Sequence, residues 1–337
     1  MNTHSLTPES SHVPVMLSEV IKLCAPLKGG NYLDCTFGGG GYTKEILNFP
    51  KTSVTALDRD KFVINIANNI KKKFPKRFNF FHEKFSNLNK LNLDKKFDVI
   101  IFDLGLSSFQ LQDFSRGFSF KSKDKLDMSM GLTSLSAEDI INNFKENDLK
   151  MILKILGEEN EASKIVKNII KKRSVKKILN VKELVQIIEH SKKKDYKKKI
   201  NVSTKTFQAL RMFVNKETTE LLEGIINATK LLKPGGKLIV VTFHSIEDKI
   251  IKYFFKNYSS SRSKPSRYLP ENNENDLNLF ENYRNKIITA SDFEIKNNSP
   301  SRSAKLRYAT RSRKTFYTPN NLKIKFKKYI DLEKKYA

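Results

Sequence analysis

The sequence predicts an α/β fold, in which an open, mostly parallel twisted sheet carries an inserted, small all-helical domain. In the first third of the chain, short apolar runs alternate with stretches of helical periodicity, a pattern typical of parallel strands joined by right-handed crossovers. More than a hundred residues then separate the fourth and fifth expected strands, far more than one crossover helix needs. We therefore expect a discontinuous sheet domain at 1–110 and 206–337, and a helical insert at 111–205.

The strands are expected in five places. They are predicted by "NYLDCTF", "SVTALDRD", "FNFFHEKF", "FDVIIFDLG" and "LLKPGGKLIVVTFHS", the last of which opens with a Pro-Gly-Gly turn. Helices are expected at "YTKEILNF", at "KFVINIANNIKKKF", with helical spacing of Phe62, Ile66, Asn69 and Ile70, and at "IEDKIIKYFF".

The insert is predicted to be helical by its caps and its apolar spacing. "SAEDIINNF" opens with a capping box from Ser136 to Asp139, and "DLKMILKILG" ends at Gly157. "ENEASKIVKNIIKKR" and "VKELVQIIEH" follow with the same periodicity. Two basic runs, 171–177 and 192–199, mark this part of the chain.

The composition points to a globular protein with an anionic partner. The 337 residues carry a formal net charge of +27 with 39% hydrophobic residues, and Lys and Arg gain affinity for polyanions by displacing counterions. The alternative is a coding bias toward Lys, Asn and Ile. Cys24 and Cys35 are the only cysteines and form no metal-binding or disulfide pattern. We expect no metal, no targeting segment, no membrane span and a cytoplasmic location.

The glycine run in "LDCTFGGGGYT" (33–43) predicts a ligand loop. A dinucleotide motif needs G-x-G-x-x-G; Gly38 and Gly40 fit, but Thr43 takes the third place. With Asp58 ending the next strand, the layout favours S-adenosylmethionine, because the glycines admit its methionine portion and the acid accepts hydrogen bonds from its ribose. A dinucleotide and an empty loop stay open as alternatives. Asp58 is also a plausible first-turn acid of a helix, a role that Asp60 fills equally well.

Longer segments resemble the bacterial 16S ribosomal RNA (cytosine N4)-methyltransferase family. In chain order these are "HVPVML", "DCTFGGGGYT", "ALDRD", "DLGLSSFQLQDFSRGFSF", "LDMSM", "FQALRMFVNKE", "PGGKLIVVTFHSIEDKIIK" and "SRSAKLR". The resemblance spans almost the whole chain. It implies a Rossmann-like domain that uses S-adenosylmethionine to methylate the exocyclic N4 of one cytosine in the decoding region of the small-subunit RNA.

The resemblance also implies a set of cofactor-binding residues. By position these are Gly40, Gly41, Tyr42, Asp58, Phe85, Asp103 and Gln110. Three positions depart from the family pattern: Tyr42 replaces a usual His, Phe109 a common Pro and Ser129 a usual Arg.

Two residues are candidates for catalysis, Asp103 in "DLGL" and His244 in "FHSIED". Asp103 would shape the junction of cofactor and base or contact the cofactor alone. His244 would touch the base or an RNA phosphate, or be a structural histidine beside a capping box from Ser245 to Asp248.

A base that reaches the methyl group must leave its stack, so an aromatic platform is expected. Phe118 and Phe120 are candidates, with a role in the core as the alternative. Arg116, Arg211, Arg302, Lys305 and Arg307 are the candidates for contacts to RNA phosphates.

The expected partner is 16S rRNA, within a small ribosomal subunit or its precursor, and a homodimer stays open. Two competing functions remain: a catalytically idle RNA-binding assembly factor, and a methyltransferase that acts on a protein or a small molecule.

Overall fold

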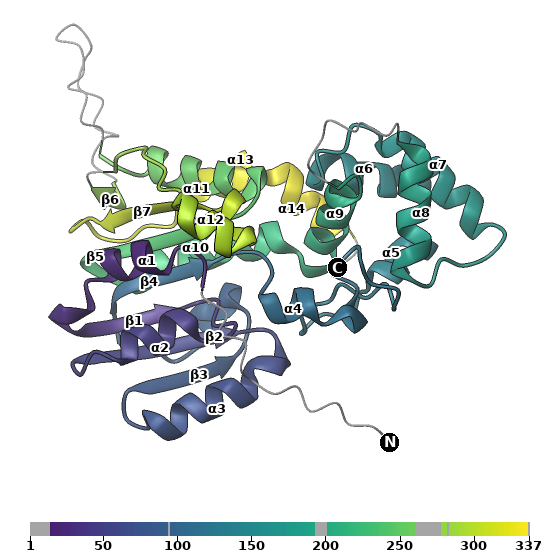
Figure 1. The fold of residues 1–337 in the computed structure, drawn as a ribbon. Helices are drawn as coiled ribbons and strands as arrows, with labels where there is room; N and C mark the ends of the chain where they lie inside the picture. The colour runs from purple at the N-terminus through teal and green to yellow at the C-terminus, as the bar shows by residue number, and fades with distance from the viewer. Residues whose placement is uncertain (1–13, 94, 193–200, 261–277, 282, 336–337) are drawn as a thin grey trace, which may run out of the picture.

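A seven-stranded sheet forms the centre of the part of the chain that the structure describes (Figure 1). The computed structural model describes residues 14–93, 95–192, 201–260, 278–281 and 283–335. The strands are β1 (Gly30–Asp34), β2 (Thr52–Asp58), β3 (Phe78–His82), β4 (Phe97–Asp103), β5 (Leu232–Thr242), β6 (Phe280–Glu281) and β7 (Lys305–Arg311). Their order is β3-β2-β1-β4-β5-β7-β6. β1 to β5 are parallel, β7 is antiparallel to β5, and β6 is antiparallel to β7.

The five expected strands and the mostly parallel sheet are confirmed, whereas β6 and β7 were not expected. The Pro-Gly-Gly segment lies within β5 rather than before it. Phe97 pairs with Leu232 but Val99 pairs with Lys237, so residues 233–236 bulge out of the ladder. Gly235 adopts φ +79° there, a conformation that glycine reaches without strain.

Helices cover both faces of the sheet. Successive side chains of a strand point to opposite faces, so Tyr32 and Val99 join one apolar cluster and Leu33 and Ile100 the other. The first cluster includes apolar residues of α1 (Leu17–Cys24), α2 (Gly41–Leu47) and α3 (Ile64–Lys73). The second includes those of α10 (Glu217–Leu231) and α11 (Ser245–Asn257).

The apolar stripe at α3 differs from the expected one. Val63, Ala67 and Ile70 are its buried residues. Phe62 lies in the preceding 3₁₀ turn η2 (Lys61–Val63) and is 58% exposed. The stripe is therefore shifted by one position, and the Phe62 ring faces solvent.

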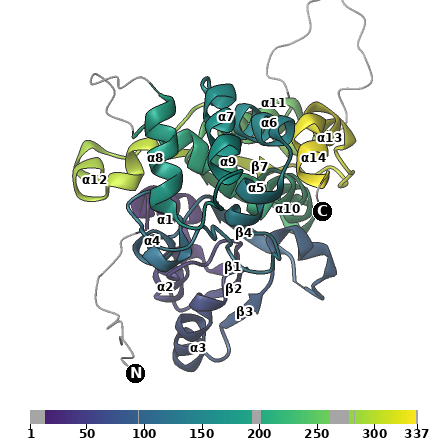
Figure 2. The same cartoon turned by 90° about the vertical axis from the view of Figure 1, so that its right-hand side faces the viewer.

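The insert is a bundle of five described helices, which Figure 2 shows in front of the sheet. They are α5 (Ala137–Asn143), α6 (Glu146–Leu156), α7 (Ala162–Arg173), α8 (Val181–Ser191) and α9 (Thr204–Asn215). The capping box of Ser136 and Asp139 is confirmed. α9 packs against α6, so the expected boundary between 205 and 206 falls inside a helix of the bundle. Of the basic run 192–199, residues 193–199 lie outside the described residues.

The last part of the chain ties the two parts together. It holds α12 (Asp292–Asn297), α13 (Asn320–Lys325) and α14 (Lys327–Lys334). In α14, the Glu333 carboxylate accepts hydrogen bonds from the backbone N–H groups of Thr218 (3.1 Å) and Thr219 (2.8 Å) at the start of α10. Just after α14, Lys335 pairs with Asp148 of α6 at 2.6 Å.

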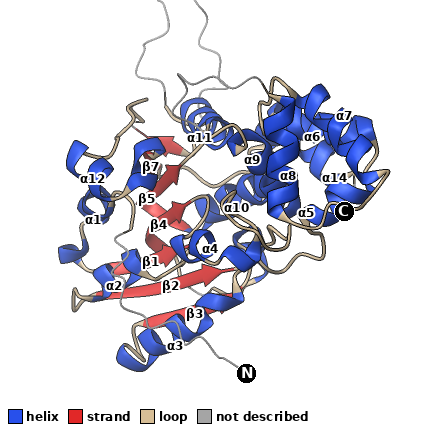
Figure 3. Ribbon diagram, turned by 45° about the vertical axis from the view of Figure 1, so that its right-hand side comes forward, coloured by secondary structure: helices blue, strands red, loops and turns tan. Residues whose placement is uncertain are grey.

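The carboxyl ends of β1 to β5 face the insert and the short helix α4 (Ser108–Gln112) (Figure 3). Asp34, Asp58 and Asp103 are the last residues of β1, β2 and β4. Ligands of open α/β sheets bind beyond these ends, so three carboxyl groups meet at the expected binding edge. None of the described helices is both long and apolar enough to cross a membrane.

Candidate active site

The glycine loop is held between two carboxylates. Asp34 is fully buried and accepts hydrogen bonds from the Thr43 hydroxyl (2.7 Å) and the Thr36 N–H (3.2 Å). Asp58 accepts from the Gly38 N–H (2.7 Å) and the Asp60 N–H (2.9 Å). Burial raises the pKa of each carboxyl to about 6, although these hydrogen bonds favour the ionised form. Asp58 is only partly buried, so its remaining lone pairs can accept hydrogen bonds from a ligand.

Two of the expected glycines have no room for a side chain. Gly40 has φ +71°, and a Cβ there would lie 2.9 Å from atoms of Phe37 and Ile70. At Gly41 a Cβ would lie 1.9 Å from Cγ of Pro14. The N-terminal segment therefore packs directly on the start of α2, and only glycine fits beneath it.

Tyr42 is buried rather than open to a cleft. Its side chain is 3% exposed, and its hydroxyl donates to the carbonyl of Val15. The same hydroxyl interacts with the carboxyl group of Asp103. At this departure from the family pattern, Tyr42 therefore links the N-terminal segment to the end of β4.

Asp103 has an unsatisfied carboxyl oxygen. Its Oδ1 atom is buried and has no hydrogen-bond partner among the described residues. Burial, followed by the charge of Asp34, raises the pKa of Asp103 to about 8, while the Tyr42 hydroxyl opposes the shift. Unsatisfied buried polar atoms are uncommon in native folds, so this oxygen fits a hydrogen-bonding group of a ligand.

Phe85 lies after β3 and Gln110 lies after β4, and both make contacts within the fold. Phe85 follows β3 and packs edge-on against Phe102, with 5.3 Å between ring centroids. Gln110 accepts from the Ser107 N–H at 2.9 Å and donates to Asp60 at 2.8 Å. These two hydrogen bonds hold the Gln110 amide in one orientation, with Phe109 at the preceding position.

His244 is the N-cap of α11, which corrects the expected capping box of Ser245 and Asp248. The box is formed by His244 and Glu247. Glu247 accepts from the N–H of Phe243 at 2.8 Å, and its other oxygen lies 3.1 Å from Nε2 of His244. His244 also lines a hollow of about 270 Å³, together with Phe243, Ser245, Thr289, Arg302, Ser303, Ala304 and Lys305.

Three of the five expected phosphate contacts are arginines that pair with acids of the fold, which does not fit that role. Arg211 pairs with Glu217 through two hydrogen bonds of 2.8 and 2.9 Å. Arg307 is 2% exposed and contacts Asp248 at 2.7 Å. Arg116 is 8% exposed and contacts Asp60 at 2.6 Å. The structure leaves Arg302 exposed, and the Lys305 side chain is 42% exposed, 3.4 Å from Asp248.

The two rings of the expected aromatic platform are packed into the fold. Phe118 is 5% exposed, and Phe120 packs edge-on against Phe207 of α9, with 6.4 Å between ring centroids. Both rings pack at the junction with the insert, in agreement with the alternative role in the core that the sequence analysis gave. At Ser129 the hydroxyl donates to Asp127 at 3.2 Å.

The sequence analysis did not name Glu247 as a site residue, and it considered Asp60 only as a first-turn acid of a helix. Glu247 lies within 4.8 Å of ligand atoms of Glu217 and His244, a grouping that could hold a cation. Both oxygens of Glu217, however, already bind the Arg211 guanidinium. Asp60 caps η2, as the alternative role for an acid at this place anticipated.

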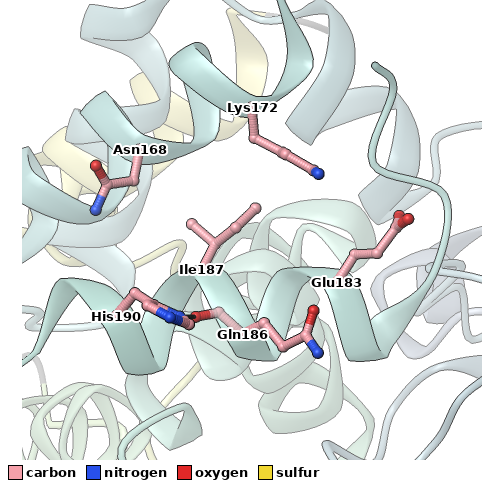
Figure 4. A pocket seen from close by; sticks show the side chains of 6 residues that line it. All are labelled: Asn168, Lys172, Glu183, Gln186, Ile187 and His190. Carbon is pink, nitrogen blue, oxygen red and sulfur yellow. Dashed lines mark hydrogen bonds between the residues drawn. The ribbon is translucent and has the colours of Figure 1, made fainter. Parts of the chain in front are cut away.

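A hollow larger than the one beside His244 lies in the insert. It has a volume of about 420 Å³ and opens between α7 and α8 (Figure 4). Its lining residues are Asn168, Lys172, Glu183, Gln186, Ile187 and His190. None of the expected site residues lines it, so the carboxyl ends of the strands remain the candidate site.

A family model described as the MraW methylase family matches residues 9–312. The chain belongs to the MraW methylase family. It is also 42% identical over 301 residues to "Ribosomal RNA small subunit methyltransferase H" of Bartonella bacilliformis, covering 89% of this chain and 90% of that protein. The protein of the same name from Rickettsia bellii is 44% identical over 306 residues, covering 89% and 99%. The expected family is thereby confirmed, and MraW family membership extends over both the sheet and the insert.

Proposed function

We propose that this MraW family member transfers a methyl group from S-adenosylmethionine to the exocyclic N4 of a cytosine in the decoding region of 16S rRNA. The observation that carries the proposal is the unsatisfied carboxyl oxygen of Asp103, beside a glycine loop that is bound to Asp58. Relatives that are 42–44% identical and named as rRNA small subunit methyltransferases support the RNA substrate.

The carboxyl ends of β1 to β4 fit the cofactor. The Asp58 carboxylate would accept hydrogen bonds from the ribose hydroxyls of the cofactor. The loop through Gly40 would lie against its methionine portion. Phe85 would contact the adenine, and Gln110 would line the site through its fixed amide. Gly41 and Tyr42 would act indirectly, because they hold the N-terminal segment and the neighbourhood of Asp103 in place.

Asp103 is the proposed acceptor for the cytosine amino group. When bound, S-adenosylmethionine supplies an electrophilic methyl group on a sulfonium. The amino nitrogen of cytosine is a weak nucleophile. As its bond to the methyl carbon forms, the methyl–sulfur bond would break, sulfur would keep that electron pair as a neutral thioether, and the nitrogen would lose one proton. In its ionised form, Asp103 would accept a hydrogen bond from that N–H and take the proton. Its pKa, raised to about 8, lies close enough to neutral pH for both protonation states to be populated. The rest of the barrier is lowered by positioning.

The RNA backbone would lie over the hollow at the ends of β5 and β7. Arg302 and Lys305 line it, together with His244, so two cations and an imidazole face the space beside the end of β5. We propose these three as phosphate contacts, in place of Arg116, Arg211 and Arg307, which pair with acids of the fold.

The proposed partner is 16S rRNA within a small ribosomal subunit or its precursor, and the proposed location is the cytoplasm, where such subunits are assembled. A homodimer stays an open prediction, because the structure contains one chain.

The test is mass mapping of 16S rRNA from cells with and without the gene, repeated with purified protein and cofactor. We expect one cytosine in the decoding region to lose its N4-methyl group without the gene, and Asp103→Asn to fail to restore it. An unchanged cytosine modification pattern would contradict the proposal.

Calorimetry with S-adenosylmethionine separates an enzyme from an idle assembly factor. We expect the wild-type chain to bind, and Asp58→Ala to bind at least about tenfold more weakly, as the loss of a hydrogen bond to a charged group predicts. Unfolding midpoints must be compared, because Asp58 also holds two backbone amides. Binding without RNA methylation would instead favour a protein or small-molecule substrate.

A further inference from the structure

Exposed aromatic rings stand close to the candidate site. Phe62 is 58% exposed and Phe109 is 42% exposed. Aromatic side chains usually contribute their large apolar area to cores or interfaces. The two phenylalanines that the sequence favoured for stacking, Phe118 and Phe120, are packed into the insert junction instead.

Both exposed rings follow carboxyl ends of parallel strands. Phe62 lies in η2, directly after β2, and Phe109 lies in α4, after β4. A carbon of the Phe109 ring is 2.9 Å from the position that a Cβ would take on Gly39. The ring therefore packs on the backbone of the glycine loop, at the mouth of the proposed cofactor site.

The two rings rest on one buried polar support. Asp60 accepts from the Phe62 N–H (3.1 Å) and from the side chains of Gln110 (2.8 Å) and Arg116 (2.6 Å). Gln110 is the neighbour of Phe109 in α4, and the Arg116 guanidinium lies 4.9 Å from the centre of the Phe62 ring. This support fixes the backbone beside both rings.

A lysine lies close to each ring. Lys44 donates to the carbonyl of Gly39, the residue on which the Phe109 ring packs, at 3.0 Å, and the Lys61 ammonium lies 5.7 Å from the Phe62 ring centre. Proteins that bind single-stranded nucleic acid combine cationic tracks for phosphates with aromatic faces for bases. The lysines favour this occupant over an apolar protein segment.

We propose that Phe62 and Phe109 form a stacking platform for unpaired bases of the RNA substrate, next to the cytosine that enters the site. The platform rests on the proposed function and adds a substrate contact to it. A cytosine that leaves its stack exposes its neighbours, and the rings cover such bases without reading their sequence.

The test compares two labelled single-stranded oligoribonucleotides of the decoding region by fluorescence anisotropy. One is intact, and the other carries abasic sites beside the target cytosine, so both present the same phosphates. We expect the wild-type chain to bind the intact strand more tightly. Phe62→Ala and Phe109→Ala should each weaken that binding by about fivefold to 150-fold, the usual range for one lost stacking contact, and change binding of the abasic strand by less than about twofold.

Two further variants and one further ligand serve as controls. Phe109→Trp keeps a stacking face and should retain the preference for the intact strand. Leu27→Ala removes an 86% exposed apolar side chain that precedes the amino end of β1, and it should change neither affinity. S-adenosylmethionine affinity should be unaltered in all variants.

Equal weakening of both strands, or no weakening of either, would overturn the proposal. Weaker cofactor binding in Phe62→Ala or Phe109→Ala would overturn it in favour of a cover for the cofactor. The proposed function is tested separately. A wild-type chain that prefers the intact strand but leaves 16S rRNA unmethylated would support the stacking platform and contradict the proposed methylation.

Discussion

At the scale of single residues, the candidate chemistry depends on a carboxyl group whose protonation the fold controls. Asp103 ends a central strand beside Asp34, and Tyr42, Glu247 and Glu294 also influence it. Three of these neighbours are acids, so ionisation of Asp103 is opposed until a cationic or N–H-bearing ligand arrives. Without a ligand, ionisation of Asp103 is therefore unfavourable in free energy, and a bound ligand would reduce this penalty.

That cost predicts a pH dependence of stability. The pKa of Asp103 is raised from 3.8 to about 8, so the folded state holds this proton more strongly than the unfolded state does. The proton on Asp103 therefore contributes to the free energy of unfolding at low pH, and this contribution is lost as pH rises from about 4 to about 8. The loss is at most about 1.4 kcal/mol per pH unit, and less where solvent screens the carboxyl group. Asp103→Asn should gain stability relative to wild type across this range. Urea unfolding at successive pH values measures the difference, and a difference that is constant with pH would contradict it.

His244 combines a structural role with a place at a hollow, and two substitutions separate these roles. Asn is a good N-cap and Ala a poor one, so His244→Ala should lose about 1 kcal/mol of stability while His244→Asn keeps it. Both should lower kcat/KM for RNA by about tenfold if the imidazole contacts a phosphate, with cofactor affinity unchanged. Full activity of His244→Asn would show that His244 acts only as the N-cap of α11.

At the scale of elements, the glycine loop is enclosed by chain that precedes the first strand. Pro14 fills the space over Gly41, and the backbone N–H of Met16 donates to Glu294 of α12 at 2.6 Å. Segments from both ends of the chain thus hold α2 in place, and with it the loop that the cofactor would touch.

This enclosure predicts a coupled pair of substitutions. In Gly41→Ala the new methyl group overlaps Pro14, so stability should fall by about 1–3 kcal/mol, as in other overpacked sites. Pro14→Gly removes the atoms that clash, and the double variant should recover most of the loss. Urea unfolding of the single and double variants closes the cycle. Strictly additive losses would mean that the two residues do not interact.

At the scale of the whole molecule, the sequence predicted what depends on local pattern. The apolar runs marked five strands, and the caps at Ser136 and Gly157 marked the insert helices. β7 was missed because its core position is taken by Arg307, whose partner Asp248 is distant in sequence. The cap of α11 was placed one residue late because His is a rare N-cap. The open oxygen of Asp103 depends on tertiary neighbours that no local pattern records.

The same distinction divides the cations of this +27 chain into those that face RNA and those that hold the fold. Exposed Arg302 and Lys305 should each contribute to the salt dependence of RNA binding, so Arg302→Ala or Lys305→Ala should lower the slope of log K against log salt by about 0.7 for a single strand. Arg307→Ala should instead leave Asp248 without its main partner in a largely buried position and cost about 3–5 kcal/mol of stability. Anisotropy titrations at several salt concentrations, with urea unfolding alongside, measure both effects. A slope that Arg302→Ala and Lys305→Ala leave unchanged would move the phosphate track away from the ends of β5 and β7.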